Sequence, residues 1–275
     1  MKRGLIITVA ILLVLILISY IVDLLAVKIL ALLLLAAAAY IFFLIQKKQT
    51  QKALEFQKGF YELKMNMIKC SLDPHFLFNA INSVTYSIHK NDSETASNNL
   101  SALSKLMRTS FTGIDSFCHE LSEEMAFVRN YLTLEKFRFS ERFNFTIKMM
   151  PYVNDVAKVP SYSIFCFVEN ALKKGILSKQ EPGNITLLID EDKPNNTLVV
   201  SITDDGICRD QRNNTETFDN IKIINELFDR LNAINDVKIS VKFSPNGKPD
   251  GQQNGCVAEL RIPLDLSYSL VPTMG

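Results

Sequence analysis

The fold of this chain is decided by the stretch Asp73-Pro74-His75-Phe76-Leu77-Phe78-Asn79, which places an ionisable imidazole near the start of a predicted helix. Pro74 suits a first helical turn, because the N–H that proline lacks has no intrahelical partner there. Apolar residues then recur at a helical spacing and predict one apolar face: Leu77, Ile81, Val84 and Ile88. A polar set repeats at the same spacing beside it: His75, Asn79, Asn82 and Tyr86. The sequence therefore predicts a histidine held next to a buried seam, where a second domain or molecule can reach it.

Helices are predicted on both sides of this stretch. The chain from Gln46 to about Asp92 is predicted to be one long helix, with an apolar face that runs up to a break at Pro74. Downstream, a turn with capping residues at 91–94 precedes a second helix, which ends near Gly113. A third helix is predicted from Ser122 toward Arg138, with two glutamates near its positive end. This part of the chain is predicted to be all-helical.

The pattern changes after residue 140. Alternating and apolar runs predict five strands, at residues 143–147, 185–189, 198–202, 237–243 and 256–262. Helices are predicted at 161–175 and 219–235 between them. An all-helical segment followed by an α+β segment is therefore expected, with the boundary near residue 140.

The N-terminus carries two apolar runs, from Gly4 to Val22 and from Leu24 to Ile45, separated by Asp23. Each has about the 20 residues that cross a hydrocarbon core. A signal peptide would need a shorter apolar region and a small-residue cleavage site. Two spanning helices joined by a very short turn are the better interpretation. Lysine and arginine flank both ends of this hairpin, which predicts that both termini of the chain lie in the cytoplasm.

The composition excludes some classes of function. The chain has 275 residues and a net charge of +1, so no nucleic-acid surface is indicated. Its five cysteines are scattered without a CxxC pair or a Cys/His cluster. A disulfide framework or a zinc site is therefore not expected, and single thiols suit a reducing cytosol.

Two further clusters could carry chemistry. Glu169 and Asn170 are adjacent polar residues inside an otherwise apolar helix. Burial of such a pair needs partners, and a hydrated Mg²⁺ with nucleotide phosphates would supply them; a solvent-facing pair is the alternative. Asp204-Asp205-Gly206 follows a predicted strand, where it could hold a ligand or form an ordinary turn.

Taken together, these segments resemble the LytS-type sensor histidine kinases, a membrane branch of the two-component systems. Residues 73–82 are similar to the H-box of that family, and residues 127–139 to its helix before the ATPase domain. Residues 168–175 are similar to the N-box, and Asp204-Asp205-Gly206 to the first glycine box. The resemblance covers residues 60–265, with the motifs in the expected order.

The resemblance implies a helical hairpin that dimerises into a four-helix bundle, followed by a Bergerat-type (GHKL) ATPase sandwich. His75 would accept the γ-phosphoryl group of ATP and pass it to an aspartate of a response regulator. Asn170 would ligate Mg²⁺, with Glu169 orienting or polarising nearby. Asp204 would bind the adenine amino group on the turn that Gly206 shapes. Lys173 would either add positive charge near the phosphates or lie at a solvated helix end.

The implied domains are a transmembrane hairpin (1–46), dimerisation and phosphotransfer helices (47–140), an ATP-binding domain (141–265) and a tail (266–275). The implied partners are a receiver domain, a second copy and the lipid bilayer, without direct contact to nucleic acid. The implied location is the cytoplasmic membrane of a bacterium, crossed twice.

The sequence departs from the family at the nucleotide lid. Alignment on Arg230-Leu231 puts Ile221 and Ile223 where the family carries glycines, and Cys208 replaces a glycine of the first glycine box. β-Branched residues resist the backbone conformations that cradle phosphates. Two hypotheses follow: a working autokinase with a divergent lid, or a degenerate kinase that acts as a membrane scaffold or is phosphorylated in trans.

Overall fold

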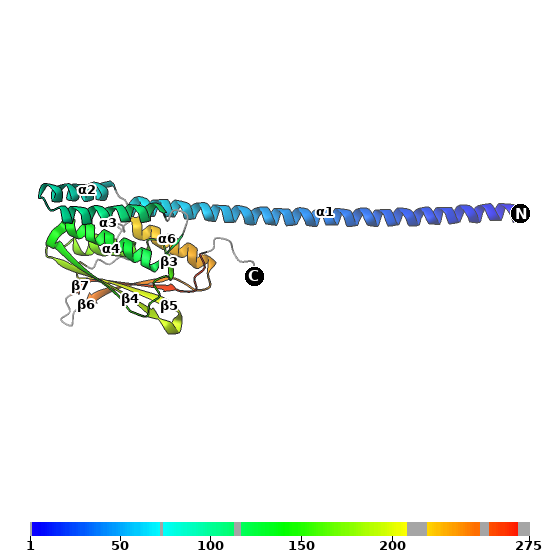
Figure 1. The fold of residues 1–275 in the computed structure, drawn as a ribbon. Helices are drawn as coiled ribbons and strands as arrows, with labels where there is room; N and C mark the ends of the chain where they lie inside the picture. The colour runs from blue at the N-terminus through cyan, green and yellow to red at the C-terminus, as the bar shows by residue number, and fades with distance from the viewer. Residues whose placement is uncertain (1, 72–73, 113–116, 208–218, 248–252, 269–275) are drawn as a thin grey trace. The chain divides into compact units, whose positions relative to one another are not determined.

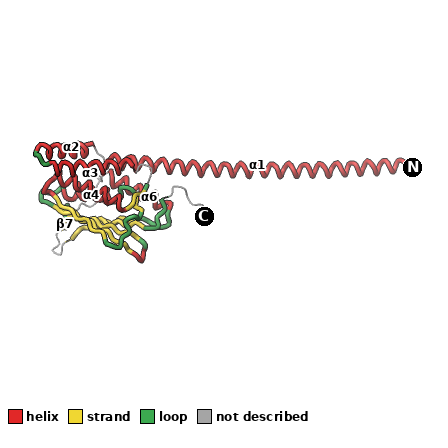
Figure 2. The backbone as a smooth tube through the Cα atoms, viewed as in Figure 1, coloured by secondary structure: helices red, strands yellow, loops and turns green. Residues whose placement is uncertain are grey.

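The computed structural model describes residues 2–71, 74–112, 117–207, 219–247 and 253–268. The chain divides into two units, Met1–Gln57 and Lys58–Gly275, and each is described by itself. Asp73, the end of the second predicted helix near Gly113 and Cys208 lie outside the described residues. Figures 1 and 2 show the elements of both units.

Helix α1 (Lys2–Ser71) is continuous through Asp23, where the sequence predicts a turn. No glycine or proline lies between Gly4 and Gly59, so no residue there favours a helix break. Within α1, Ile11–Gln51 is apolar and exposed enough to be a candidate membrane span. Its 41 residues would rise about 60 Å as a helix, roughly twice the thickness of a hydrocarbon core. One apolar helix is thus present among the described residues, and the predicted two-pass hairpin is not confirmed.

Helices α2 (Pro74–His89) and α3 (Ser93–Thr112) form an antiparallel hairpin. Asn91 takes a left-handed conformation in the turn, and Asp92 Oδ1 accepts the Thr95 N–H at 3.0 Å, as the predicted capping chemistry requires. The buried face of α2 differs from the predicted one and consists of Phe76, Ala80, Val84 and Ser87. Ile81 and Ile88 remain 51% and 61% exposed, so most of the predicted apolar stripe flanks the buried face.

The α+β segment is built on a mixed five-stranded sheet in the order β2-β4-β5-β7-β6. Its strands are β2 (Phe143–Met149), β4 (Gly183–Asp192), β5 (Thr197–Asp204), β6 (Ser240–Gly247) and β7 (Gln253–Pro263). Only the β2–β4 pair is parallel. The register stacks apolar residues across the central strands, for example Leu187 opposite Ile202 and Ile202 opposite Ala258. The predicted five strands are confirmed.

The helices of this unit lie on one side of the sheet (Figure 1). Helix α5 (Ser163–Asn170) and the π-helical turn η2 (Ala171–Ile176) contact its strands, and α6 (Asp219–Ile234) packs on α5. Helix α5 is buried along its first seven residues, and its Phe167 stacks on Phe228 of α6 at 6.4 Å between ring centroids. The opposite face of β4 alternates with the buried one and carries more exposed residues. The core therefore lies between the sheet and the helices.

Helix α4 (Leu121–Phe139) joins the helical hairpin to the α+β segment. It packs against α3 on one side and α5 on the other. Aromatic contacts run through it, with Phe76 of α2 against Tyr131 at 5.5 Å and Tyr131 against Phe165 of α5 at 5.0 Å. A short strand pair that the sequence did not predict, β1 (Cys118–Glu120) with β3 (Lys158–Pro160), secures the start of α4.

Glu124 of α4 is completely buried and binds the start of α5. Its carboxylate accepts the N–H groups of Tyr162, Ile164 and Phe165 at 2.9, 3.1 and 3.2 Å. These are the donors that a helix leaves unsatisfied at its N-terminus, where negative charge is also favoured. The predicted place of this glutamate in the first turn of its own helix is confirmed, and the structure shows in addition that it caps α5.

We predict that Glu124→Ala lowers the free energy of unfolding by roughly 3 kcal/mol or more, because it leaves three buried N–H groups without an acceptor. Thermal unfolding of the full chain in detergent micelles measures this. Glu123→Ala is the matched control, since Glu123 accepts the exposed Glu120 N–H, and it should cost about 1 kcal/mol. Equal losses in the two variants would contradict the capping role.

Candidate functional site

His75 is exposed in the first turn of α2, at the second residue of the helix. The Asn79 side-chain nitrogen, one turn later, lies 3.2 Å from both ring nitrogens. An amide N–H can donate to whichever ring nitrogen carries no proton. Asn79 thus restrains the orientation of the imidazole while leaving its face open to solvent.

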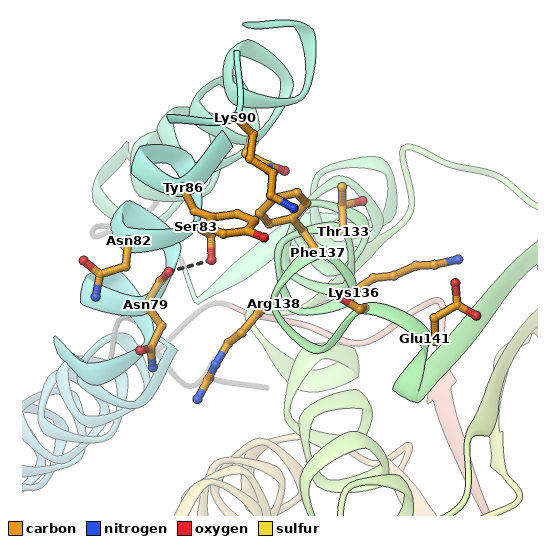
Figure 3. A pocket seen from close by; sticks show the side chains of 12 residues that line it. Asn79, Asn82, Ser83, Tyr86, Lys90, Thr133, Lys136, Phe137, Arg138 and Glu141 are labelled. Atoms are coloured by element: carbon orange, nitrogen blue, oxygen red, sulfur yellow. Dashed lines mark hydrogen bonds between the residues drawn. The ribbon is translucent and has the colours of Figure 1, made fainter. Parts of the chain in front are cut away.

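The polar set that the sequence placed beside the apolar stripe shares one flank of α2. Asn79, Asn82 and Tyr86 line an open cavity of about 900 Å³, together with residues of α4 that include Thr133 and Arg138. Figure 3 shows the α2 side chains on one side of this cavity and Thr133, Phe137 and Lys136 on the other. The cavity begins one helical turn after His75.

Glu169 and Asn170 end helix α5 in different environments. Glu169 is 3% exposed, pairs with Lys173 at 2.6 Å and accepts a hydrogen bond from the Asn220 amide of α6. A solvent-facing Glu169, one of the two expectations, is therefore wrong. Lys173 is in an ion pair, which neither expectation included. Asn170 is half-buried at the junction of α5 and η2, where its amide oxygen could serve as a metal ligand.

A second buried carboxylate, which sequence reasoning missed, lies on α4. Glu135 is 1% exposed and pairs with Arg138 at 3.5 Å. Burial raises the pKa of Glu135, against the lowering effects of the Arg138 and Lys173 charges, and Glu169 raises it further. The pKa of buried Tyr131 is also raised, first by burial and then by Glu169 and Glu135. The spacing of Glu135 and Arg138 on a helix, beside apolar neighbours, was the available signal.

Asp204 ends β5 and meets the end of the N-box turn. It is 4% exposed, and its Oδ1 accepts the Gly206 N–H at 2.8 Å. A Cβ on Gly175 would lie 2.6 Å from Oδ1, and one on Gly206 only 2.1 Å from the Gly175 backbone. The Ile207 N–H also donates to the Gly175 carbonyl at 3.1 Å. The structure thus brings together Asp204, Gly206 and the end of the N-box, and the glycines permit this close approach.

The pKa of Asp204 is raised to about 6 by burial, against the lowering effect of the Gly206 and Cys256 N–H groups. Asp205 behaves differently. Burial opposes its ionisation, but the Lys179 ammonium at 2.8 Å and the Asn184 amide outweigh burial and lower its pKa. The negative charge of Asp205 is therefore paired within the fold.

The positions aligned with the glycine lid lie inside helix α6. Ile221 is 2% exposed and packs into the core, whereas Ile223 is half-buried. The Asn220 side-chain amide, one residue earlier, donates to Glu169. The two positions therefore form helix in this structure, and Ile221 also belongs to the core.

The remaining two histidines differ in position. His89 is exposed at the end of α2, as expected. His119 is 4% exposed on β1, 3.5 Å from the buried Glu124 carboxylate and edge-on to Tyr162 at 5.3 Å between ring centroids. Cys256 is disulfide-bonded, contrary to the expectation of single thiols, whereas Cys118 and Cys166 are not in disulfides.

We predict that Asp204 makes stability depend on pH. Because its pKa in the fold is raised, its favourable contribution is complete below about pH 3.8 and is lost as the pH rises through about 6. Relative to Asp204→Asn, which cannot ionise, the wild type should lose on the order of 2 kcal/mol between pH 4 and pH 7. Melting temperatures of both proteins at pH 4.5 and 7.5 measure the difference. Parallel pH profiles would show that Asp204 does not titrate in this range.

Known proteins match this chain in sequence. Residues 63–143 match the family model for histidine kinases. The sensor protein LytS of Staphylococcus saprophyticus is 33% identical over 160 residues, which is 58% of this chain and 25% of the relative. LytS of Enterococcus faecalis is 32% identical over 145 residues, which is 53% of this chain and 24% of the relative. The sensor histidine kinase/phosphatase LytS of Staphylococcus aureus is 30% identical over 151 residues, covering 54% and 26%.

The chain spans about a quarter of the length of these relatives. Solved histidine kinases match less closely. The catalytic domain of ThkA gives a TM-score of 0.36 at 15% identity, covering 53% of this chain and 94% of that one. A mycobacterial sensor histidine kinase, MprB, gives a TM-score of 0.39 at 12% identity, covering 53% of this chain and 95% of that one. Over the matched segments, the chain is therefore similar to the histidine kinase family model and to the LytS sensor proteins.

Proposed function

We propose that this chain is a membrane sensor histidine kinase that phosphorylates His75 from ATP and passes the phosphoryl group to an aspartate on a response regulator. The observation that carries the proposal is the exposed imidazole of His75 with the Asn79 amide 3.2 Å from its ring nitrogens. A neutral imidazole is a competent nucleophile near pH 7. Exposure lets an ATP-binding domain and then a receiver domain reach the same nitrogen in turn.

The residues around Asp204 fit a nucleotide and Mg²⁺ in part. Asp204 offers a buried carboxylate that could accept from an adenine amino group, on the close turn that Gly206 and Gly175 allow. Asn170 offers one oxygen ligand, which suits a Mg²⁺ whose other ligands are phosphate and water. Glu169 would position this end of α5 through Lys173 and Asn220 rather than touch the ion.

The chain's own contribution to the transfer would be positioning. Bound Mg²⁺-ATP supplies the phosphoryl group and neutralises its charge. Asn79 would restrain the His75 ring until its unprotonated nitrogen is released from the amide N–H and faces the γ-phosphorus. That nitrogen forms the N–P bond as the bond from the γ-phosphorus to the bridging β–γ oxygen breaks. The second ring nitrogen would keep its proton until solvent accepts it.

We predict that the full chain in nanodiscs, given Mg²⁺ and γ-labelled ATP, acquires an acid-labile label that His75→Ala abolishes. Asn79→Ala should slow labelling about tenfold, within the range for a lost positioning interaction. His89→Ala is the matched control, because it removes an exposed histidine from the same helix and should leave labelling unchanged. If the wild type takes no label and binds no fluorescent ATP analogue, the scaffold hypothesis replaces the autokinase.

We also propose that the chain acts as a homodimer with a four-helix bundle. Exposed apolar side chains on α2 and α3 support this, since a bundle would cover them: Phe78, Ile81, Ile88, Leu100 and Met107. Sedimentation of the full chain in detergent tests the dimer, and a monomer would contradict it. In the proposed division, residues 1–46 anchor the protein, 47–140 dimerise and carry His75, 141–265 bind ATP, and 266–275 form a tail.

The anchor is proposed to cross the cytoplasmic membrane of a bacterium twice, with both termini inside. The length of the apolar span, about twice that of one crossing, supports a hairpin. We predict that alkaline phosphatase, which is active only outside the cytoplasm, is active when fused after Asp23 and inactive when fused after Lys48. Activity after Lys48 would instead indicate a single crossing.

A further inference from the structure

The cavity between α2 and the end of α4 carries an excess of positive charge. Lys90, Lys136 and Arg138 line it, against one carboxylate, Glu141. Asn82 and other amide and hydroxyl groups complete a lining rich in hydrogen-bond donors. Its volume of about 900 Å³ is within the range of small-molecule sites. Such a lining favours an anion with several acceptor oxygens.

One buried side chain in this lining points to a ligand more directly. Asn99 of α3 is 3% exposed, and its Nδ2 has no hydrogen-bond partner among the described residues. A buried donor without an acceptor costs about 1–3 kcal/mol, and an amide carries two such N–H groups. An acceptor oxygen of a bound ligand would remove this cost.

The cations of the cavity are held in different ways. Lys136 donates to Asn144 at 2.8 Å, so part of its hydrogen-bonding capacity is used. The ammonium of Lys90 lies over the Tyr86 ring at 4.8 Å in an exposed position. Arg138 makes a long ion pair, 3.5 Å, with Glu135. A planar guanidinium has five N–H donors, so one long contact leaves capacity for a bidentate anion.

The opposite flank of α2 shows that this cavity is compatible with the proposed dimer. The exposed apolar residues Ile81 and Ile88 project from a different side of the helix than Asn82 and Tyr86, because the two sets are out of phase by about a third of a turn. A second copy that covers the apolar flank would leave the polar flank open.

We infer that this cavity binds a compact polyvalent anion, a phosphate- or carboxylate-bearing small molecule, at a site separate from the nucleotide site. Asn99 and Lys90 donate to its oxygens, and Arg138 binds it in place of the long contact with Glu135. The site depends on neither ATP nor His75, so its failure and the failure of the proposed kinase activity are separable.

The test is isothermal titration calorimetry of the full chain in neutral-lipid nanodiscs, without nucleotide or Mg²⁺. Inorganic pyrophosphate is the phosphate probe and citrate the carboxylate probe, so the two titrations distinguish the ligand classes. We expect at least one probe to bind with a stoichiometry of one per chain. Asn99→Leu, Lys90→Gln and Arg138→Gln should each weaken binding about tenfold or more. Asn99→Leu is the sharpest variant, since leucine has the same branching as asparagine but lacks the amide with the unsatisfied nitrogen.

Two control variants test whether binding is confined to this cavity. Lys105→Gln removes an exposed charge from α3 outside the cavity and should leave the affinity unchanged. Asn170→Ala should also bind as the wild type does, because the nucleotide site is not involved. No heat from either probe at millimolar concentration would overturn the inference. The inference would also be overturned if Lys105→Gln lost as much affinity as the cavity variants do, or if Asn170→Ala lost binding.

Discussion

The contact between the Glu124 carboxylate and the start of α5 is the constraint on which the rest of the structure depends. A carboxylate with no solvent exposure is tolerated only because three backbone N–H groups and the nearby His119 surround it. Tyr162, the residue before α5, takes a left-handed conformation that such a contact helps to hold. The direction of α5, and with it the position of Glu169 and Asn170 at its far end, therefore follows from a side chain of α4.

Helix α4 consequently serves both halves of the unit that contains His75. On one side, Tyr131 contacts Phe76 of the histidine-bearing helix, and on the other it contacts Phe165 of α5. The buried Glu135 lies within the electrostatic influence of Glu169 and Lys173 on the N-box. Burial of several charges is costly unless they neutralise one another, so any displacement of α4 relative to α5 would also disturb the pairing of those charges.

The sequence predicted what depends on local patterns and missed what depends on contacts across the chain. Alternating and apolar runs predicted the strands, whereas the contact between Asp204 and Gly175 was not predicted. The buried face of α2 was misplaced because Ile81 and Phe76 are equally apolar, and only packing against α4 decides which is covered. The role of Glu124 was equally hidden, since its partners lie about 40 residues later. The sequence shows that the lid glycines are absent, but it does not show that Ile221 packs into the core.

The π-helical turn η2 has a consequence for how this region can change over time. Six residues there complete a widened turn, which brings the Gly175 carbonyl to the Ile207 N–H and the Gly175 Cα against Asp204. Deletion of one residue between Ala171 and Lys174 would restore an ordinary α-helix. The later residues of this helix would then be rotated about its axis by about 100°. The helix would have regular geometry, but the close contact between Gly175 and Asp204 would be lost. Length variants should therefore be rarer in this segment than in the turn at 193–196, where the strands on either side are joined only by exposed residues.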